Sequence, residues 1–292
     1  MADDMDDFDA EEFQASVVRL SRDLVAAAAT MSEAEARYLV DAYYIHQEGR
    51  KRLGNQMGSM GDEPHQLISW QWAQSKTMED QIKRALEIYS EQKLIGRWLT
   101  AHYGIGPVIA SGLMAHIDIH KAKTAGAIWR FGGMDPTSKW ERGEKRPWNA
   151  GLKTLFWKVG QSFMKFSGRP ACVYGHEYVR RKRMEVARNE KGFNAERAAQ
   201  ILTEKNFKKT TEAYKAYSIG KLPPAHVDAQ ARRYAVKIFI SHVHYVWRFI
   251  ELKKVPRDPY AIGKMDHQTF IPPQNIDMIP GLAKAMRKAG HI

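Results

Sequence analysis

The chain has 292 residues, which is enough for about two domains with substantial cores. It carries 45 Lys and Arg residues against 33 Asp and Glu residues, and its net charge of +12 is typical of proteins that bind nucleic acid. The single cysteine, Cys172, excludes an internal disulfide and a cysteine-based zinc site. Because the sequence has no secretory signal and no apolar run of about 18 residues, we expect a soluble cytoplasmic protein without membrane contact.

The charge is distributed unevenly along the chain. Residues 1–12 contain seven acidic residues and no basic one, so the other 280 residues carry 45 basic against 26 acidic residues, a net charge of +19. We interpret residues 1–12 as an acidic disordered tail. Two roles stay open for it: a solubilising end without further function, or a segment that occupies the protein's own basic surface or recruits a replication or recombination protein.

Helical periodicity begins directly after this tail. Apolar residues at helical spacing predict a first helix over residues 13–29. Ser32 and Glu35 have the spacing of a capping box and predict the start of a second helix, which we expect to reach about Leu53. Residues 54–64 predict a flexible break.

A long third helix is expected over residues 65–100, and no alternating strand pattern precedes it. The predicted fold class is therefore mainly α. Residues 13–98 form a helical N-terminal arm or bundle, whose long helices are the candidate contact of a homo-oligomer. We expect residues 99–254 to form a second helical domain, which the motifs described below assign to DNA binding, and residues 255–292 to form a proline-punctuated C-terminal tail. Further helices are expected over residues 148–166, 174–190, 195–206, 208–217 and 225–253, with a short terminal one over 279–289.

The segment after residue 98 reads as two short helices joined by a Gly-Ile-Gly turn. Gly104 and Gly106 allow positive φ in this turn, and Pro107 suits the first position of the second helix. The backbone N–H groups of Val108 and Ile109 would then face an anion at the positive end of the helix dipole. The turn therefore predicts a DNA phosphate contact, and the alternative is a helical corner without a ligand.

Basic and aromatic residues alternate after this turn. Lys and Arg side chains neutralise phosphates, and an exposed aromatic ring offers a base a stacking face. We expect Trp140 to stack on a base and assign Trp157 to the core, with Trp148 open between these roles. A second basic cluster, in the predicted helix 174–190, is either a solvated face or an extension of the same contact. The basic residues predicted to bind DNA are Lys139, Arg142, Lys145, Arg146, Lys153, Arg180, Arg181, Lys182 and Arg183.

Three further motifs follow the Gly-Ile-Gly turn in order. They are a short helix at Ala127–Gly133 that ends in Met134-Asp135-Pro136, a basic stretch at Lys139–Arg146, and a helix that opens at Asn149–Leu155. This order resembles the C-terminal helix-hairpin-helix transposase domain of the bridge-RNA-guided insertion-sequence transposases, over residues 99–167. The resemblance implies a helix-hairpin-helix DNA-binding fold and a protein of a phage or mobile element.

Transposases of this family also have an N-terminal nuclease domain with metal-binding carboxylates, and a nucleophilic serine that glycine follows. The helical first hundred residues offer no strand for such carboxylates, and Ser138 is not followed by glycine. The histidine pairs His116/His120 and His242/His244 lack an accompanying carboxylate arrangement, and no phosphate-binding Gly-x-x-x-x-Gly-Lys motif is present. We therefore expect no catalytic residue, metal or cofactor.

The sequence predicts a non-enzymatic, largely sequence-independent DNA-binding protein that acts in phage or mobile-element replication, recombination or genome handling. Single-stranded DNA is slightly favoured over duplex because of the interleaved aromatic residues and the acidic tail, although a helix-hairpin-helix more often contacts duplex. Two alternatives remain. One is an active transposase or recombinase that uses Ser138 or Asp135, and the other is an RNA-binding or structural partner protein.

Overall fold

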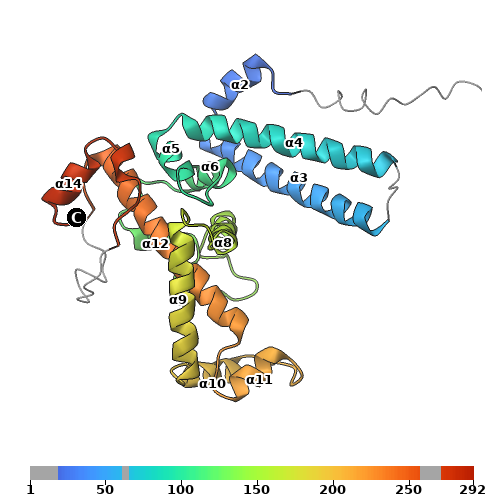
Figure 1. Ribbon diagram of the computed structural model, residues 1–292, viewed down its shortest axis with the longest axis vertical. Coiled ribbons are helices and arrows are strands. Elements are labelled where there is room, and N and C mark those ends of the chain that lie inside the picture. Colours follow the sequence, from blue (N-terminus) through green and yellow to red (C-terminus); the bar gives the residue numbers. More distant parts are fainter. Residues whose placement is uncertain (1–18, 61–65, 257–270) are drawn as a thin grey trace, which may run out of the picture. The chain divides into compact units, whose positions relative to one another are not determined.

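A computed structural model describes residues 19–60, 66–256 and 271–292, and these residues contain helices and no strands. The mainly helical fold class is thus confirmed. The acidic segment 1–12 lies outside the described residues. The helices are α2 (Arg22–Ala29), α3 (Glu33–Ser59), α4 (Gln66–Glu91), α5 (Leu94–Thr100), α6 (Pro107–His116), α7 (Ala125–Phe131), α8 (Ala150–Lys165), α9 (Val173–Glu190), α10 (Ala195–Glu204), α11 (Glu212–Ser218), α12 (Pro224–Leu252), the 3-10 helix η1 (Ile276–Met278) and α14 (Leu282–Lys288) (Figure 1).

The chain divides into two compact units. The first comprises Met1–Thr100 with Gly106–Asp118, and the second comprises Ala101–Ile105 with Ile119–Ile292. The first unit therefore contains α2 to α6, and the second contains α7 to α14. None of the helices in the described parts of either unit is both long enough and apolar enough to span a bilayer.

In the first unit, α3 and α4 lie side by side as a long antiparallel pair (Figure 1). The start of α3 confirms the capping box: the Ser32 hydroxyl accepts the Glu35 N–H, and the Glu35 carboxylate accepts the Ser32 N–H at 2.7 Å. The expected end at Leu53 is wrong, because α3 continues to Ser59. The glycines in this last stretch have low helix propensity, but the stretch is held against α4, where Gly54 packs on Trp72.

The single helix expected over residues 65–100 is also wrong, because the chain breaks between α4 and α5. Gly96 permits the close packing of α5 that accompanies this break. A Cβ at this position would lie 1.9 Å from the carbonyl oxygen of Ser90, so α5 folds back onto the end of α4 in a contact that only glycine permits. Helix α6 then packs on both α3 and α4, and the Ser111 hydroxyl donates to the Leu86 carbonyl at 2.8 Å.

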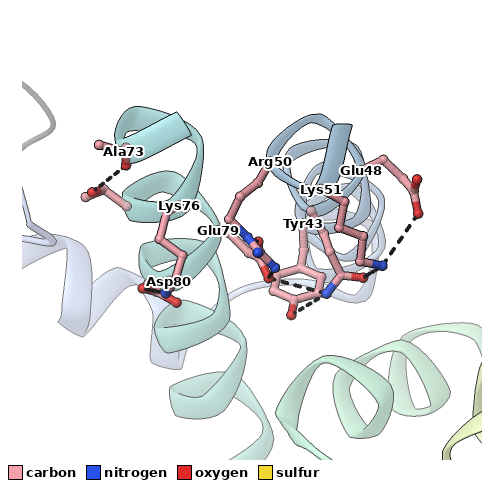
Figure 2. Close-up of polar contacts among 10 residues, drawn as sticks. Tyr43, Glu48, Arg50, Lys51, Ala73, Lys76, Glu79 and Asp80 are labelled. Atoms are coloured by element: carbon pink, nitrogen blue, oxygen red, sulfur yellow. Dashed lines mark hydrogen bonds and ion pairs between the residues drawn. The ribbon is translucent and has the colours of Figure 1, made fainter. Parts of the chain in front are cut away.

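A polar network joins α3 and α4 (Figure 2). The Nε of Arg50 lies 2.6 Å from the carboxylate of Glu79, and the Gln47 amide donates to the same carboxylate at 3.3 Å. Glu79 is buried. Burial raises the pKa of Glu79, but the hydrogen bonds from Arg50, Gln47 and Tyr43 outweigh it and hold the pKa below its usual value.

The second unit is built on α12, which packs against α7, α8 and α9. Its core is aromatic, and Phe163, Tyr174 and Phe239 contact one another with ring centroids 5.0–5.3 Å apart. The apolar stripe predicted for α8 is confirmed, because Leu152, Leu155, Phe156, Val159 and Phe163 are all buried. Helix α14 confirms the short terminal helix expected near residues 279–289.

Candidate nucleic-acid interface

The Gly-Ile-Gly turn has the geometry expected at its first glycine only. Gly104 has φ +92°, and its carbonyl accepts a hydrogen bond from the Ser162 hydroxyl. Gly106 has φ −90° and ψ 175°, which is extended backbone, so the expected positive φ at Gly106 is wrong. Pro107 occupies the first turn of α6 as predicted. The division between the two units runs between Ile105 and Gly106.

The start of α6 leaves two backbone donors without an intrahelical acceptor. The Ala110 N–H is the first to bond within the helix, to the Gly106 carbonyl at 3.0 Å, so the N–H groups of Val108 and Ile109 precede the helical ladder. The Val108 side chain is buried with Val40 and Leu86 and therefore belongs to the core. The contact of these donors with a phosphate stays a prediction.

A more elaborate arrangement lies in the second unit, and we call it the aromatic–basic surface. It consists of the end of α7, the loop 132–149 and the first turn of α8. Asn149 holds these parts together: its N–H donates to the Phe131 carbonyl at 2.8 Å, and its side-chain oxygen accepts the Leu152 N–H at 2.8 Å. The asparagine thus caps α8 and connects it to α7. The side chains of the surface that matter below are Phe131, Lys139, Trp140, Arg142, Lys145, Arg146, Trp148 and Lys153.

Two consecutive glycines allow the close packing behind this surface. A Cβ on Gly132 would lie 2.0 Å from the ring of Phe156. Gly133 has φ +67°, and a Cβ there would lie 2.9 Å from both Trp148 and Lys153. Glycine is required because Trp148 and Lys153 lie directly against the backbone.

The two tryptophans of the surface are held by cations and by each other. The Arg146 guanidinium lies 5.1 Å from the centroid of the Trp140 ring, and the Lys153 ammonium lies 3.8 Å from that of Trp148. The two rings meet edge to face with centroids 6.5 Å apart. The indole N–H of Trp140 also donates to the Glu144 carbonyl at 2.8 Å. Burial, and then the charge of Arg146, lowers the pKa of Lys153.

Four cations of the loop stay available to a partner. Lys139, Arg142, Lys145 and Arg146 are exposed, and none of them forms an ion pair with another residue of the described segments. The carboxylate of Glu144 is turned toward the Glu141 N–H, at 3.4 Å, rather than toward one of these cations. The loop therefore presents positive charge next to fixed aromatic rings.

The predicted cluster on α9 behaves differently, because carboxylates of the same unit neutralise most of it. Three of its four cations form ion pairs, and only Arg183 has none among the described residues. The pairs are Arg180 with Glu177 at 2.6 Å, Arg181 with Glu185 at 2.5 Å and Lys182 with Asp228 at 2.7 Å. The Arg181 guanidinium also lies 4.7 Å from the centroid of the Tyr234 ring on α12.

Trp157 corrects one assignment made from the sequence. It was expected in the core, yet 59% of its surface is exposed. The spacing itself contains the reason, since Trp157 lies two residues after Leu155 and therefore about 200° around the helix from that buried side chain.

Asp135 and Ser138, the residues that the transposase alternative would use, form a turn. The Asp135 carboxylate accepts the N–H of Thr137 at 2.9 Å and its hydroxyl at 2.7 Å, and it lies 3.2 Å from Arg130. The backbone hydrogen bond from Thr137 is the main reason why the pKa of Asp135 is lowered. The Ser138 N–H donates to the Asp135 carbonyl at 3.3 Å.

The buried histidines of α12 have structural partners. The His242 ring lies between the Tyr174 hydroxyl and the Ile271 carbonyl, each at 2.8 Å, and the His244 ring bonds the Ala122 carbonyl at 3.0 Å. Within the described segments, no group of three or more His, Cys, Asp or Glu side chains is arranged to hold a metal ion.

An open hollow lies in the aromatic–basic surface and has a volume of about 420 Å³. Phe131, whose ring is exposed, is not among the residues predicted from the sequence to bind DNA. The sequence did indicate that this side chain is exposed, because Phe131 is the last helical residue before two glycines and does not belong to an apolar stripe. The lining residues are Phe131, Lys145, Arg146, Pro147, Trp148 and Asn149.

Comparison of the chain with protein-family models and curated proteins, and of its fold with solved structures, gives no match.

Proposed function

We propose that this chain is a non-enzymatic, largely sequence-independent DNA-binding protein and that the aromatic–basic surface is its main contact. The observation that carries the proposal is the combination of two fixed tryptophan rings with four exposed cations that form no ion pair with another described residue. Exposed cations bind the phosphates of any nucleic acid, and oriented rings offer stacking faces to any base.

We infer binding without regard to base sequence because polar groups of the surface already have partners within the protein. Reading a base requires donors and acceptors that are free to meet its edge. Here the Asn149 side-chain oxygen caps α8, and the Arg146 guanidinium lies near the Trp140 ring. The other three loop cations, Lys139, Arg142 and Lys145, have flexible exposed side chains that suit contacts with phosphates rather than with base edges.

The biological setting of the proposal rests on the resemblance of residues 99–167 to a transposase domain. We propose that the protein acts in the cytoplasm of a bacterial host, in the replication, recombination or handling of phage or mobile-element DNA. Residues 1–12 are proposed to recruit a replication or recombination protein, and α3 and α4 to support a homo-oligomer.

The test is a binding titration with single-stranded DNA, duplex DNA and RNA of equal length, followed by fluorescence anisotropy. With about four phosphate contacts, the logarithm of the affinity for duplex should fall with the logarithm of the salt concentration with a slope of about −3 to −4. The variant Arg142→Glu/Lys145→Glu should bind at least about tenfold more weakly at low salt, because two contacts become repulsive.

A matched control is Lys208→Glu/Lys209→Glu. These exposed lysines lie in the same unit, outside the aromatic–basic surface, and form no ion pair with another described residue. Equal losses in the two double variants, or no detectable binding at low salt, would refute the proposed site. Tighter binding of RNA would favour the RNA-binding alternative. Cleavage of supercoiled DNA with magnesium that disappears in Ser138→Ala would favour the transposase.

A further inference from the structure

We infer that the hollow beside Phe131 and Trp148 receives one unpaired nucleobase, and that the aromatic–basic surface thereby selects single-stranded over duplex DNA. This inference rests on the proposed function and adds to it the class of DNA and the residue that decides the selection. Phe131 is that residue.

The size and lining of the hollow suit a base with its phosphate. Its volume of about 420 Å³ lies in the range of pockets that hold small organic ligands. Phe131, Pro147 and Trp148 form apolar surfaces, while Lys145 and Arg146 supply two positive charges. The lining contains no carboxylate, so its charge is complementary to an anionic ligand. A nucleotide combines a flat aromatic ring with a negative charge and matches both parts of the lining.

Base pairing decides which nucleic acid can use the hollow. In a duplex, both faces of each base are covered by its neighbours in the stack, so entry would require breaking that stack and the base pair. A single strand presents unpaired bases that can turn toward an aromatic side chain without this penalty.

The walls of the hollow are fixed by contacts within the protein. The Phe131 carbonyl is fixed by the Asn149 N–H, and Trp148 is fixed against Gly133 and Lys153. Binding therefore requires little rearrangement of the protein, which lowers the entropic cost of association. Phe131 itself is 47% exposed, so its ring is available to stack.

The variant Phe131→Ala tests the inference. Loss of one stacking contact should weaken the binding of a single-stranded oligonucleotide by about 5- to 100-fold. Duplex affinity should change by less than about twofold, because stacked bases do not reach the ring. The matched control is Trp157→Ala, which removes an exposed aromatic ring of the same unit that does not line the hollow. Phe131→Trp should retain single-strand binding, because it keeps an aromatic face.

A second measurement detects the stacking of the base directly, through the fluorescence of a base analogue. A single strand with one 2-aminopurine should show quenched fluorescence on binding to the wild-type protein and to Trp157→Ala, but not to Phe131→Ala. Unchanged quenching in Phe131→Ala, or equal losses for single strand and duplex, would overturn the inference. If Arg142→Glu/Lys145→Glu still abolishes binding in that case, the proposed function stands without the base site. If wild-type protein binds no oligonucleotide, the proposed function itself is wrong.

Discussion

The ammonium of Lys153 lies 3.8 Å from the centroid of the Trp148 ring, and both side chains rest against Gly133. This relationship orients one wall of the hollow, because the ring is held on one side by a cation and on another by the backbone. The same pair ties the first turn of α8 to the turn that follows α7. The aromatic–basic surface therefore depends on a glycine as much as on its aromatic residues.

Gly133→Ala should disturb this wall. The substitution forces a residue with a Cβ to φ +67° and places that Cβ 2.9 Å from Trp148 and Lys153. We expect the free energy of unfolding to fall by about 1–3 kcal/mol and the tryptophan fluorescence to shift. Gly143→Ala is the control, because Gly143 also has positive φ but has no atom within 4 Å of its Cβ position. If both variants shift the fluorescence equally, the Gly133 contact does not orient Trp148.

Arg50→Met should destabilise the pair of α3 and α4. The substitution leaves the buried Glu79 carboxylate without its guanidinium, which lies 2.6 Å away. We expect a loss of about 2–4 kcal/mol in urea unfolding, somewhat less than for a fully buried pair because the Arg50 side chain is 24% exposed. Lys76→Met removes the exposed pair with Asp80, also drawn in Figure 2, and should change stability by less than about 0.5 kcal/mol. Similar losses in both would contradict a special role for the buried pair.

Acid should destabilise the second unit through its buried histidines. Burial lowers the pKa values of His242 and His244 to about 4, although each ring donates a hydrogen bond to a backbone carbonyl, which opposes part of this lowering. The unfolded chain binds protons near pH 6.5, so stability is complete above that pH and falls as the pH decreases toward 4. Melting temperatures measured from pH 7.5 to pH 4.5 should show this decline.

The variant His242→Phe should flatten part of this decline, because an uncharged ring fills the same aromatic core. It should also lower stability at pH 7.5, because the hydrogen bonds to Tyr174 and Ile271 are lost. His176→Gln, at an exposed position of α9, should keep the wild-type pH profile. An unchanged profile in His242→Phe would assign the acid sensitivity to other groups.

The four cations of α9 should separate into two classes. Lys182→Glu places a negative charge beside Asp228, 2.7 Å from the present ammonium, and should lower the free energy of unfolding by about 1–2 kcal/mol. Arg183→Glu disrupts no ion pair of the described residues, so stability should stay within about 0.5 kcal/mol while DNA affinity falls. Thermal melts and anisotropy titrations measure the two effects. If neither variant weakens DNA binding, the α9 cluster is not part of the contact.

Local features of the structure were predictable because their causes lie within a few residues of sequence. The Ser32–Glu35 capping box, the proline at the start of α6 and the buried stripe of α8 all follow from short-range geometry. The same helical geometry would have placed Trp157 outside the core if it had been applied to that residue.

Tertiary packing decided the rest. Only the contact of α5 with the end of α4 explains the break before Gly96, because the helical pattern of residues 65–100 continues across it. Likewise, composition marks both basic segments as equal candidates for DNA binding. The fold distinguishes them, because carboxylates on α9 and α12 neutralise three cations of the α9 segment. The four cations of residues 139–146 form no ion pair with another residue of the described ranges. The sequence alone determined the helical class and the positive charge of this protein, and three-dimensional proximity determined which of those charges a partner can reach.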